Sequence, residues 1–110
     1  MILDAATAII PSEKLRDYLL SSTHPIGRYK SAFFHSLGYV RDQHEILERD
    51  LRAVLANEAQ PTDTTEYGQK FAARGVLPGV NNRRSGRIVS VWIILRGETA
   101  PRFVTAYPEE

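Results

Sequence analysis

The chain has 110 residues, of which 43% are hydrophobic and 25% charged, and its formal net charge is only +1. This length suits one domain spanning residues 1–110, and the composition excludes a disordered chain. Cysteine is absent, which excludes disulfide bonds and thiolate metal sites and is typical of a reducing cytoplasm, where we expect the protein to act. No apolar stretch is long enough to span a membrane, and the first residues lack the basic start of a signal peptide.

Three helices are predicted in the first half of the chain, where apolar residues recur every three or four positions. Their expected ranges are 12–20, 28–36 and 42–57. Pro11 and Ser12 begin the first helix, with Ser12 as its N-cap. Leu15, Tyr18 and Leu19 follow the helical spacing, so we expect them on one face of that helix.

The second predicted helix carries a lysine on its apolar stripe, and Gly38 is expected to end it. The stripe consists of Lys30, Phe33, Phe34 and Leu37, which are spaced by three and four positions. A lysine in such a place either extends its ammonium past its neighbours to water or takes part in a site. These two interpretations stay open at the level of the sequence.

The remainder of the chain predicts one more helix and then an antiparallel sheet. Asp42, with Glu45 three residues later, resembles a capping box at the start of the third helix. Strands are expected at 67–76, 87–95 and 102–107. The stretch RIVSVWIIL is apolar on both faces, so it should be the central strand. Residues 60–64 are predicted to form a loop.

This order of elements predicts an α+β fold, with about three N-terminal helices packed on one face of a three- or four-stranded antiparallel sheet. A fourth strand would have to come from the N-terminus or from the hairpin region. In the last strand, Phe103, Thr105 and Tyr107 alternate with their neighbours, so we expect these three side chains on one face.

Two groups of side chains could together cleave RNA without a metal ion. His24, Arg28 and Lys30 surround the start of the second helix. Thr105 and Tyr107 lie two residues apart on the last strand. Attack by the 2′-hydroxyl of RNA needs a base, an acid, and cations or donors for the charge that develops on the phosphate. Taken singly, each of these residues also has an ordinary structural explanation, as an exposed loop residue, a surface lysine or a strand former.

Charge is unevenly distributed along the chain. Residues 74–102 contain six arginines and one acidic residue, whereas residues 42–66 contain seven acidic residues and two arginines. The basic segment could face an anion such as RNA, or it could form solvated surfaces. The candidate substrate-binding residues are Arg28, Arg83, Arg84, Arg87, Tyr67 and Trp92. The three histidines lack a metal-ligand spacing, so neither a metal nor another cofactor is predicted.

Five segments together resemble a small bacterial family known as a domain of unknown function. They are KLRDYLL, HPIGRYKSAFF, EYGQKF, VSVWII and PRFVTAYP, in this order. The most specific pieces are H-P-x-G-x-x-K-[SA]-x-x-F and P-R-x-x-T-x-Y. Such domains resemble the C-terminal toxin modules of polymorphic toxin systems. Those modules are similar in turn to the metal-independent ribonucleases of the barnase, EndoU, colicin and RelE group.

The resemblance implies that His24, Lys30, Thr105 and Tyr107 are catalytic. It also implies structural roles for Gly27 and Trp92, so Trp92 is either a core residue of the central strand or a contact for RNA. The chain is less basic than the members of that group that act on the ribosome, which argues against ribosome-bound cleavage.

Our leading hypothesis is an endoribonuclease toxin of a toxin–antitoxin or polymorphic toxin system, for which we expect a small, acidic antitoxin protein as the neutralising partner. His24 or Lys30 would be the general base, Tyr107 would donate or orient the proton, and Thr105 would hold the phosphate. The alternatives are a non-catalytic module that binds protein or nucleic acid, and an antitoxin or immunity component.

Overall fold

The computed structural model describes residues 1–23 and 28–109, and only the backbone of residues 28 and 29. Within this part of the chain, helices come first and strands follow, so the predicted α+β fold is confirmed. The helical elements are α1 (Ser12–Lys14), which continues as the π-helical segment η1 (Leu15–Leu19), α2 (Arg28–Ser36), the 3-10 turn η2 (Arg41–Gln43) and α3 (His44–Leu55). The strands are β1 (Ala59–Thr64), β2 (Gly68–Leu77), β3 (Gly86–Leu95) and β4 (Arg102–Pro108).

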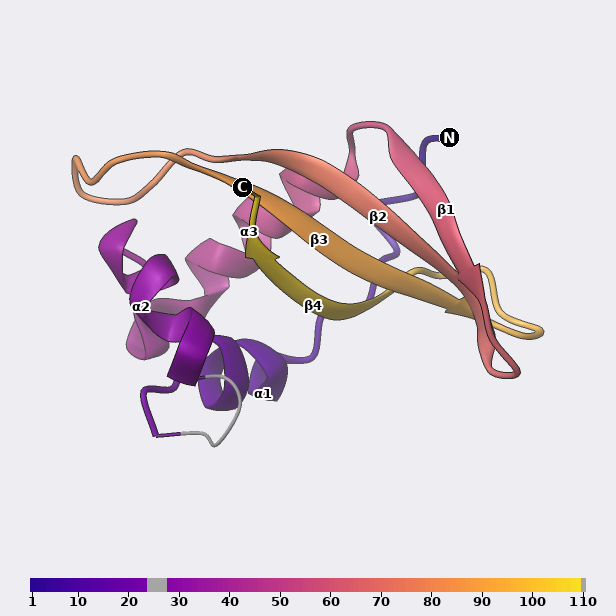
Figure 1. Ribbon diagram of the computed structural model, residues 1–110, viewed down its shortest axis with the longest axis horizontal. Coiled ribbons are helices and arrows are strands. Elements are labelled where there is room, and N and C mark those ends of the chain that lie inside the picture. Colours follow the sequence, from indigo (N-terminus) through magenta and orange to yellow (C-terminus); the bar gives the residue numbers. More distant parts are fainter. Residues whose placement is uncertain (24–27, 110) are drawn as a thin grey trace.

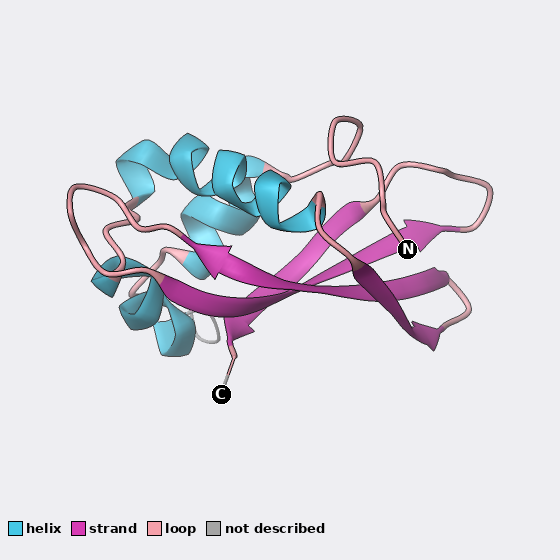
Figure 2. Ribbon diagram, turned by 90° about the horizontal axis from the view of Figure 1, so that it is seen from above, coloured by secondary structure: helices cyan, strands magenta, loops and turns pink. Residues whose placement is uncertain are grey.

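The four described strands form one antiparallel sheet in the order β1-β2-β3-β4 (Figure 1). β3 pairs with β2 on one side and β4 on the other, which confirms its predicted place inside the sheet. α3 packs on one face against β2 and β3, whereas α1, η1 and α2 gather near β4 (Figures 1 and 2). No helix among the described residues is long and apolar enough to cross a membrane.

The fourth strand comes from a segment that was predicted to be a loop. Residues 60–64 belong to β1, which pairs with β2 and has only Ala59 buried. Pro61 and Asp63 have low strand propensity, and both are tolerated because β1 is an edge strand that pairs on one side only. The strand forms because β2 provides hydrogen-bond partners for its backbone, and the local sequence of residues 60–64 does not predict this pairing.

Two predicted helix caps are also wrong. Pro11, in an extended conformation, occupies the N-cap of α1 in place of Ser12, and no side chain caps that end. Asp42 lies inside the 3-10 turn that precedes α3, and neither helix start there has a side-chain cap. The predicted end of α2 is confirmed, since Gly38 has φ +95° and its N–H donates to the carbonyl of His35.

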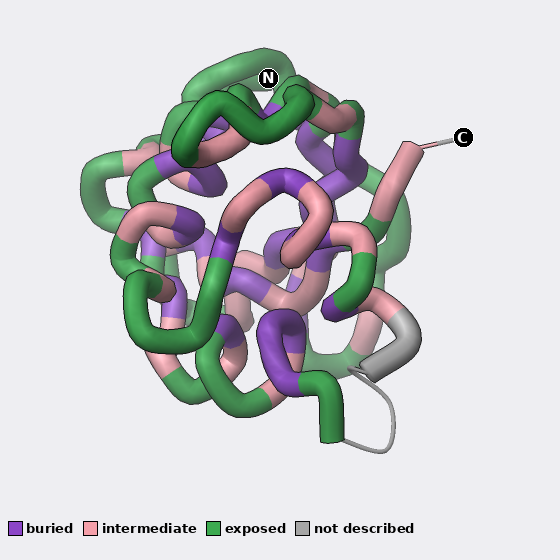
Figure 3. Tube along the Cα trace, turned by 90° about the vertical axis from the view of Figure 1, so that its left-hand side faces the viewer, coloured by how far each residue is buried: buried purple, intermediate pink, exposed green. Residues whose placement is uncertain are grey.

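The hydrophobic core lies between α3 and the sheet, where buried positions gather in the interior of the molecule (Figure 3). The predicted stripe of α3 is buried, with Leu47, Leu51, Val54 and Leu55 at most 2% exposed. From the sheet, Trp92 is fully buried, and its indole N–H donates to Ser90 Oγ at 2.8 Å. A core of this size fixes α3 on the sheet and leaves β4 as the edge beside which the other helices lie.

Candidate functional site

Lys30, in the first turn of α2, extends across to β4. Its ammonium donates hydrogen bonds to Thr105 Oγ1 at 2.9 Å and to the Tyr18 hydroxyl at 3.2 Å. The same nitrogen lies 6.0 Å from the centre of the Tyr107 ring. A cation is not favoured near a helix N-terminus, so this position is explained better by the groups that Lys30 meets than by α2 itself. The structure therefore brings Lys30, Thr105 and Tyr107 together.

A β-bulge in β4 points Thr105 and Tyr107 towards Lys30. Thr105 is opposite Val91, yet Phe103 is opposite Trp92, so two steps on β4 correspond to one on β3. The bulge turns Phe103 into the core at 2% exposure while Tyr107 stays 40% exposed. The prediction that all three alternating side chains share one face is thus wrong for Phe103, because strict alternation is broken by the extra residue.

Tyr18 joins Lys30, Thr105 and Tyr107 in one cluster, and the sequence did not single it out as a site residue. It lies in the π-helical segment η1, a geometry that is rare and frequent at functional sites. Lys30 Nζ lies 5.4 Å from the centre of the Tyr18 ring, in addition to the hydrogen bond to its hydroxyl. A usable signal was present in the sequence, since KLRDYLL was one of the segments that carried the family resemblance.

The surroundings of Tyr18 make its phenol more acidic than usual. Partial burial by itself raises the pKa of Tyr18, but the hydrogen bonds from Lys30 and Thr105 and the charges of Lys30 and Lys14 outweigh it and leave the pKa below its ordinary value of 10.0. A phenol with a lowered pKa can exchange a proton with a substrate more readily than an ordinary tyrosine.

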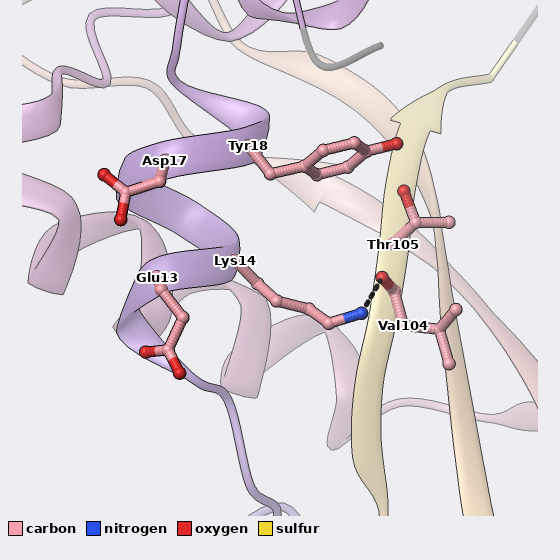
Figure 4. A pocket seen from close by; sticks show the side chains of 6 residues that line it. All are labelled: Glu13, Lys14, Asp17, Tyr18, Val104 and Thr105. Atoms are coloured by element: carbon pink, nitrogen blue, oxygen red, sulfur yellow. Dashed lines mark hydrogen bonds between the residues drawn. The ribbon is translucent and has the colours of Figure 1, made fainter. Parts of the chain in front are cut away.

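Tyr18 and Thr105 line a pocket of about 510 Å³ between the α1–η1 segment and β4 (Figure 4). Lys14 extends from the helical side of the pocket, and its ammonium donates to the backbone oxygen of Val104 at 3.2 Å. Tyr18 also points towards β4, whereas Glu13 and Asp17 point away from the strand. The lining of the pocket therefore presents the phenol of Tyr18, the hydroxyl of Thr105 and the ammonium of Lys14 together.

Asp17, one of the two acidic residues that line this pocket, is held in its charged form. Asp17 accepts hydrogen bonds from Arg16 at 3.1 Å and from Arg41 at 2.9 Å, which lower the pKa of its carboxyl group. Asp17 points to the outer side of the helical segment, away from Tyr18 (Figure 4).

The predicted arginines lie around the hairpin between β2 and β3. Arg84 donates to Ser36 Oγ at 2.9 Å, and its guanidinium lies 5.9 Å from the centre of the Phe33 ring, so it ties the hairpin to α2. Arg83 and Arg87 are exposed, and neither forms an ion pair within the described part of the chain.

The two predicted aromatic contacts do not join the cluster. Tyr67 is 68% exposed, but it lies in the turn between β1 and β2, at the end of the sheet away from α2 (Figure 1). Trp92 is fully buried in the core, so it cannot serve as a stacking surface for RNA, and its prediction as a contact is wrong. His24 lies outside the described residues, as does the side chain of Arg28.

No group of three or more His, Asp and Glu side chains within residues 1–23 and 28–109 is arranged to hold a metal ion. The described residues instead place the hydroxyls of Tyr18 and Thr105, which can donate and accept protons, around the ammonium of Lys30.

Comparison with known proteins places the chain in a family without assigning it an activity. No curated protein matches it, and no solved structure does. A family model described as a domain of unknown function (DUF6883) matches residues 2–110. The match spans nearly the whole chain and confirms the resemblance to a family of unknown function, without extending to the ribonucleases. The chain belongs to the DUF6883 family.

Proposed function

We propose that this protein is a metal-independent endoribonuclease that acts as a toxin and cleaves RNA through attack by the 2′-hydroxyl. The observation that carries the proposal is the contact of Lys30 with the hydroxyls of Tyr18 and Thr105 beside a pocket of about 510 Å³. An ammonium, a phenol with a lowered pKa and a second hydroxyl are the kinds of group that phosphodiester cleavage needs when no metal takes part.

Tyr18 is the general base in this proposal. Its phenolate, favoured by the ammonium of Lys30, takes the proton of the 2′-hydroxyl as that oxygen attacks phosphorus. Lys30 was expected to be a base itself, but it donates hydrogen bonds to two hydroxyls, which suits a cation that stabilises negative charge better than a proton acceptor.

Lys30 and Thr105 stabilise the charge that develops on the phosphate. An ammonium has three N–H donors, and Tyr18 and Thr105 take two of them, so the third can bind a phosphate oxygen. Thr105 accepts from Lys30, and its own hydroxyl hydrogen, which bonds the phenol of Tyr18 in the free protein, can rotate to a second phosphate oxygen. The ammonium of Lys30 is held in place before the substrate arrives, and this preorganisation lowers the barrier.

The leaving 5′-oxygen takes a proton from Tyr107, whose ring lies 6.0 Å from the ammonium of Lys30, or from His24. The bond from phosphorus to the 5′-oxygen breaks as the bond to the 2′-oxygen forms. The products are a 2′,3′-cyclic phosphate and a 5′-hydroxyl, and the proton taken by Tyr18 balances the proton given to the leaving oxygen. No other reactant is consumed.

A toxin of this kind needs a partner that neutralises it in the producing cell. The exposed Arg83 and Arg87 on the β2–β3 hairpin have no ion-pair partner within the described residues, so they can face an acidic antitoxin. An antitoxin bound there would lie beside α2, since Arg84 connects the same hairpin to that helix.

The test is to produce the chain alone in bacteria and to incubate the purified protein with RNA in the presence of EDTA. We expect growth arrest and cleavage that EDTA does not prevent, and in Tyr18→Phe and Lys30→Met we expect loss of the arrest and strongly reduced cleavage. Tyr67→Phe is the matched control, since it also removes one phenol hydroxyl, lies in the β1–β2 turn at the far end of the sheet, and keeps the ring by which Tyr67 would stack on RNA. Harmless expression together with intact total RNA would refute the nuclease and leave a non-catalytic binding module as the better description.

A further inference from the structure

The face of the sheet opposite α3 carries a row of three residues from adjacent strands. Val89 on β3 is opposite Arg74 on β2 and opposite Tyr107 on β4. Residues opposite one another in a sheet point to the same face, so Arg74 and Tyr107 flank Val89 on one surface. Two strand spacings separate their backbones by about 10 Å. Tyr107 therefore belongs both to this row and to the surroundings of Lys30.

A hollow of about 490 Å³ lies over this row, lined by Arg74, Val89, Tyr107, Pro108 and Glu109. Helical residues reach this face at its β4 edge, where Lys30 and Tyr18 meet Thr105. Val89 is only 3% exposed, because the side chains around it form the walls of the hollow. An apolar floor with an aromatic and a guanidinium at its sides is suited to a nucleotide, whose base stacks and whose phosphate pairs with the cation.

A carboxylate already occupies the anion position in this hollow. Glu109 Oε2 accepts a hydrogen bond of 2.7 Å from Arg74 Nε, and the side chain of Arg74 is 58% exposed. The Nη groups of Arg74 have no hydrogen-bond partner in the described part of the chain. A guanidinium binds carboxylate and phosphate with the same planar set of donors. An exposed ion pair contributes little to stability, so a phosphate can replace Glu109 readily.

We propose that Arg74 holds the phosphate of an RNA nucleotide next to the cleavage point, with the base of that nucleotide against Tyr107, and that the carboxylate of Glu109 takes the place of this phosphate when RNA is absent. The inference rests on the proposed function, because it names a subsite of the same RNA-binding surface. Arg87 is exposed in the neighbouring row on the same face of the sheet. It extends the positive charge in the direction that a bound RNA strand would follow.

The experiment measures binding of a fluorescent single-stranded DNA, which lacks the 2′-hydroxyl and so reports binding without cleavage. We expect Arg74→Ala to weaken binding about tenfold and to reduce the slope of log affinity against log salt by about 0.7, the value for one phosphate contact on a single strand. Glu109→Gln should tighten binding about two- to fivefold by removing the competing charge. In the Arg74→Ala background, Glu109→Gln should have no further effect.

Two matched controls separate this subsite from general charge effects. Arg96→Ala removes an exposed arginine from the turn between β3 and β4, and Glu98→Gln removes a carboxylate that pairs with Arg102 at 3.0 Å. Both lie at the other end of the sheet, so both should leave binding within about twofold of the wild type. Thermal melting of each variant checks that these exposed substitutions leave the fold intact.

The outcomes distinguish this subsite from the nuclease proposal. Unchanged affinity and salt slope in Arg74→Ala, or no tightening in Glu109→Gln, would overturn the subsite even if the wild type cleaves RNA. Binding that depends on Arg74 in a protein that leaves RNA intact would support the subsite and refute the nuclease. A wild-type protein that fails to bind the DNA would overturn the subsite directly.

Discussion

Lys30 on α2 and Thr105 on β4 are joined by a hydrogen bond of 2.9 Å between residues that lie 75 positions apart in the chain. The bond connects a helix to an edge strand at a place that η1 also reaches, through the hydroxyl of Tyr18. Three elements that have separate local patterns therefore share one cluster of donors and acceptors.

Replacing Tyr18 with phenylalanine should reduce RNA cleavage about 10²- to 10⁴-fold, the usual contribution of a general base. The ring stays, so the contacts of η1 with β4 should survive and the melting temperature should change little. Single-turnover cleavage of a short RNA measures the effect. A Tyr18→Phe protein that cleaves at the wild-type rate would exclude Tyr18 as the base.

Replacing Lys30 with methionine should move the pH dependence of cleavage to higher pH. In the wild type the rate should rise as Tyr18 loses its proton, with a midpoint below the ordinary phenol value of 10.0. Burial opposes ionisation of Tyr18, and Lys30 overcomes it by hydrogen bond and charge, so the pKa of Tyr18 rises when the ammonium is removed.

Ultraviolet absorbance of tyrosinate checks the same shift without any substrate. The signal of Tyr18 is obtained as the difference between two proteins that differ only by Tyr18→Phe, once with Lys30 present and once with methionine in its place. A midpoint that does not move when Lys30 is removed would contradict the assigned coupling.

Replacing Thr105 with valine should lower the cleavage rate about tenfold, because one hydrogen bond to the ammonium and one donor to the phosphate are lost. Thr105→Ser keeps the hydroxyl and should stay within a few-fold of the wild type. Equal losses in the two variants would show that the methyl group, and not the hydroxyl, matters at this position.

Replacing Tyr39 with phenylalanine should lower the free energy of unfolding by about 1–3 kcal/mol. Tyr39 is buried, and its hydroxyl donates to Asp50 Oδ2 at 2.7 Å, so its removal leaves a carboxylate that is 5% exposed with one partner fewer. Arg49 still donates to the other oxygen of Asp50, which limits the loss. Urea denaturation measures the change, with Tyr67→Phe as the exposed control.

Tyr39 should also make the fold sensitive to strong alkali. Burial and the hydrogen bond to Asp50 raise the pKa of Tyr39 above its ordinary value of 10.0. Above pH 10 the unfolded chain releases this proton while the folded chain keeps it, so the free energy of unfolding falls as pH rises. Tyr39→Phe should remove that part of the slope, and a slope that persists unchanged would assign it to other groups.

Local patterns predicted much of this fold. Helices α2 and α3 each bury one face, which produces apolar residues at helical spacing. Strand β3 lies inside the sheet, which produces a continuous apolar run. Both patterns can be recognised within a short window of sequence. Lys30 was identified in the same way, as a charge on an apolar stripe, and the structure places Phe34 and Leu37 of that stripe in the core.

The features that were missed depend on partners distant in sequence. β1 is a strand because β2 pairs with it, and its polar residues show no periodicity. Phe103 left the face of Thr105 because of a bulge that only the register with β3 reveals. The sequence leaves Trp92 either in the core or in contact with RNA, and its full burial depends on the packing of the sheet in the folded protein.

The amino-acid sequence by itself determined the class of fold and most of the elements, because these follow from hydrophobic periodicity within single segments. The same periodicity identified Lys30 as a candidate site residue. Only the tertiary structure decided that Tyr18 meets Lys30 and Thr105, and that Arg74 and Tyr107 flank Val89 on one face of the sheet, with Glu109 paired to Arg74. The physical reason is that a hydrogen bond or ion pair between side chains acts over about 3 Å, so it exists only once packing and strand register have brought distant residues together.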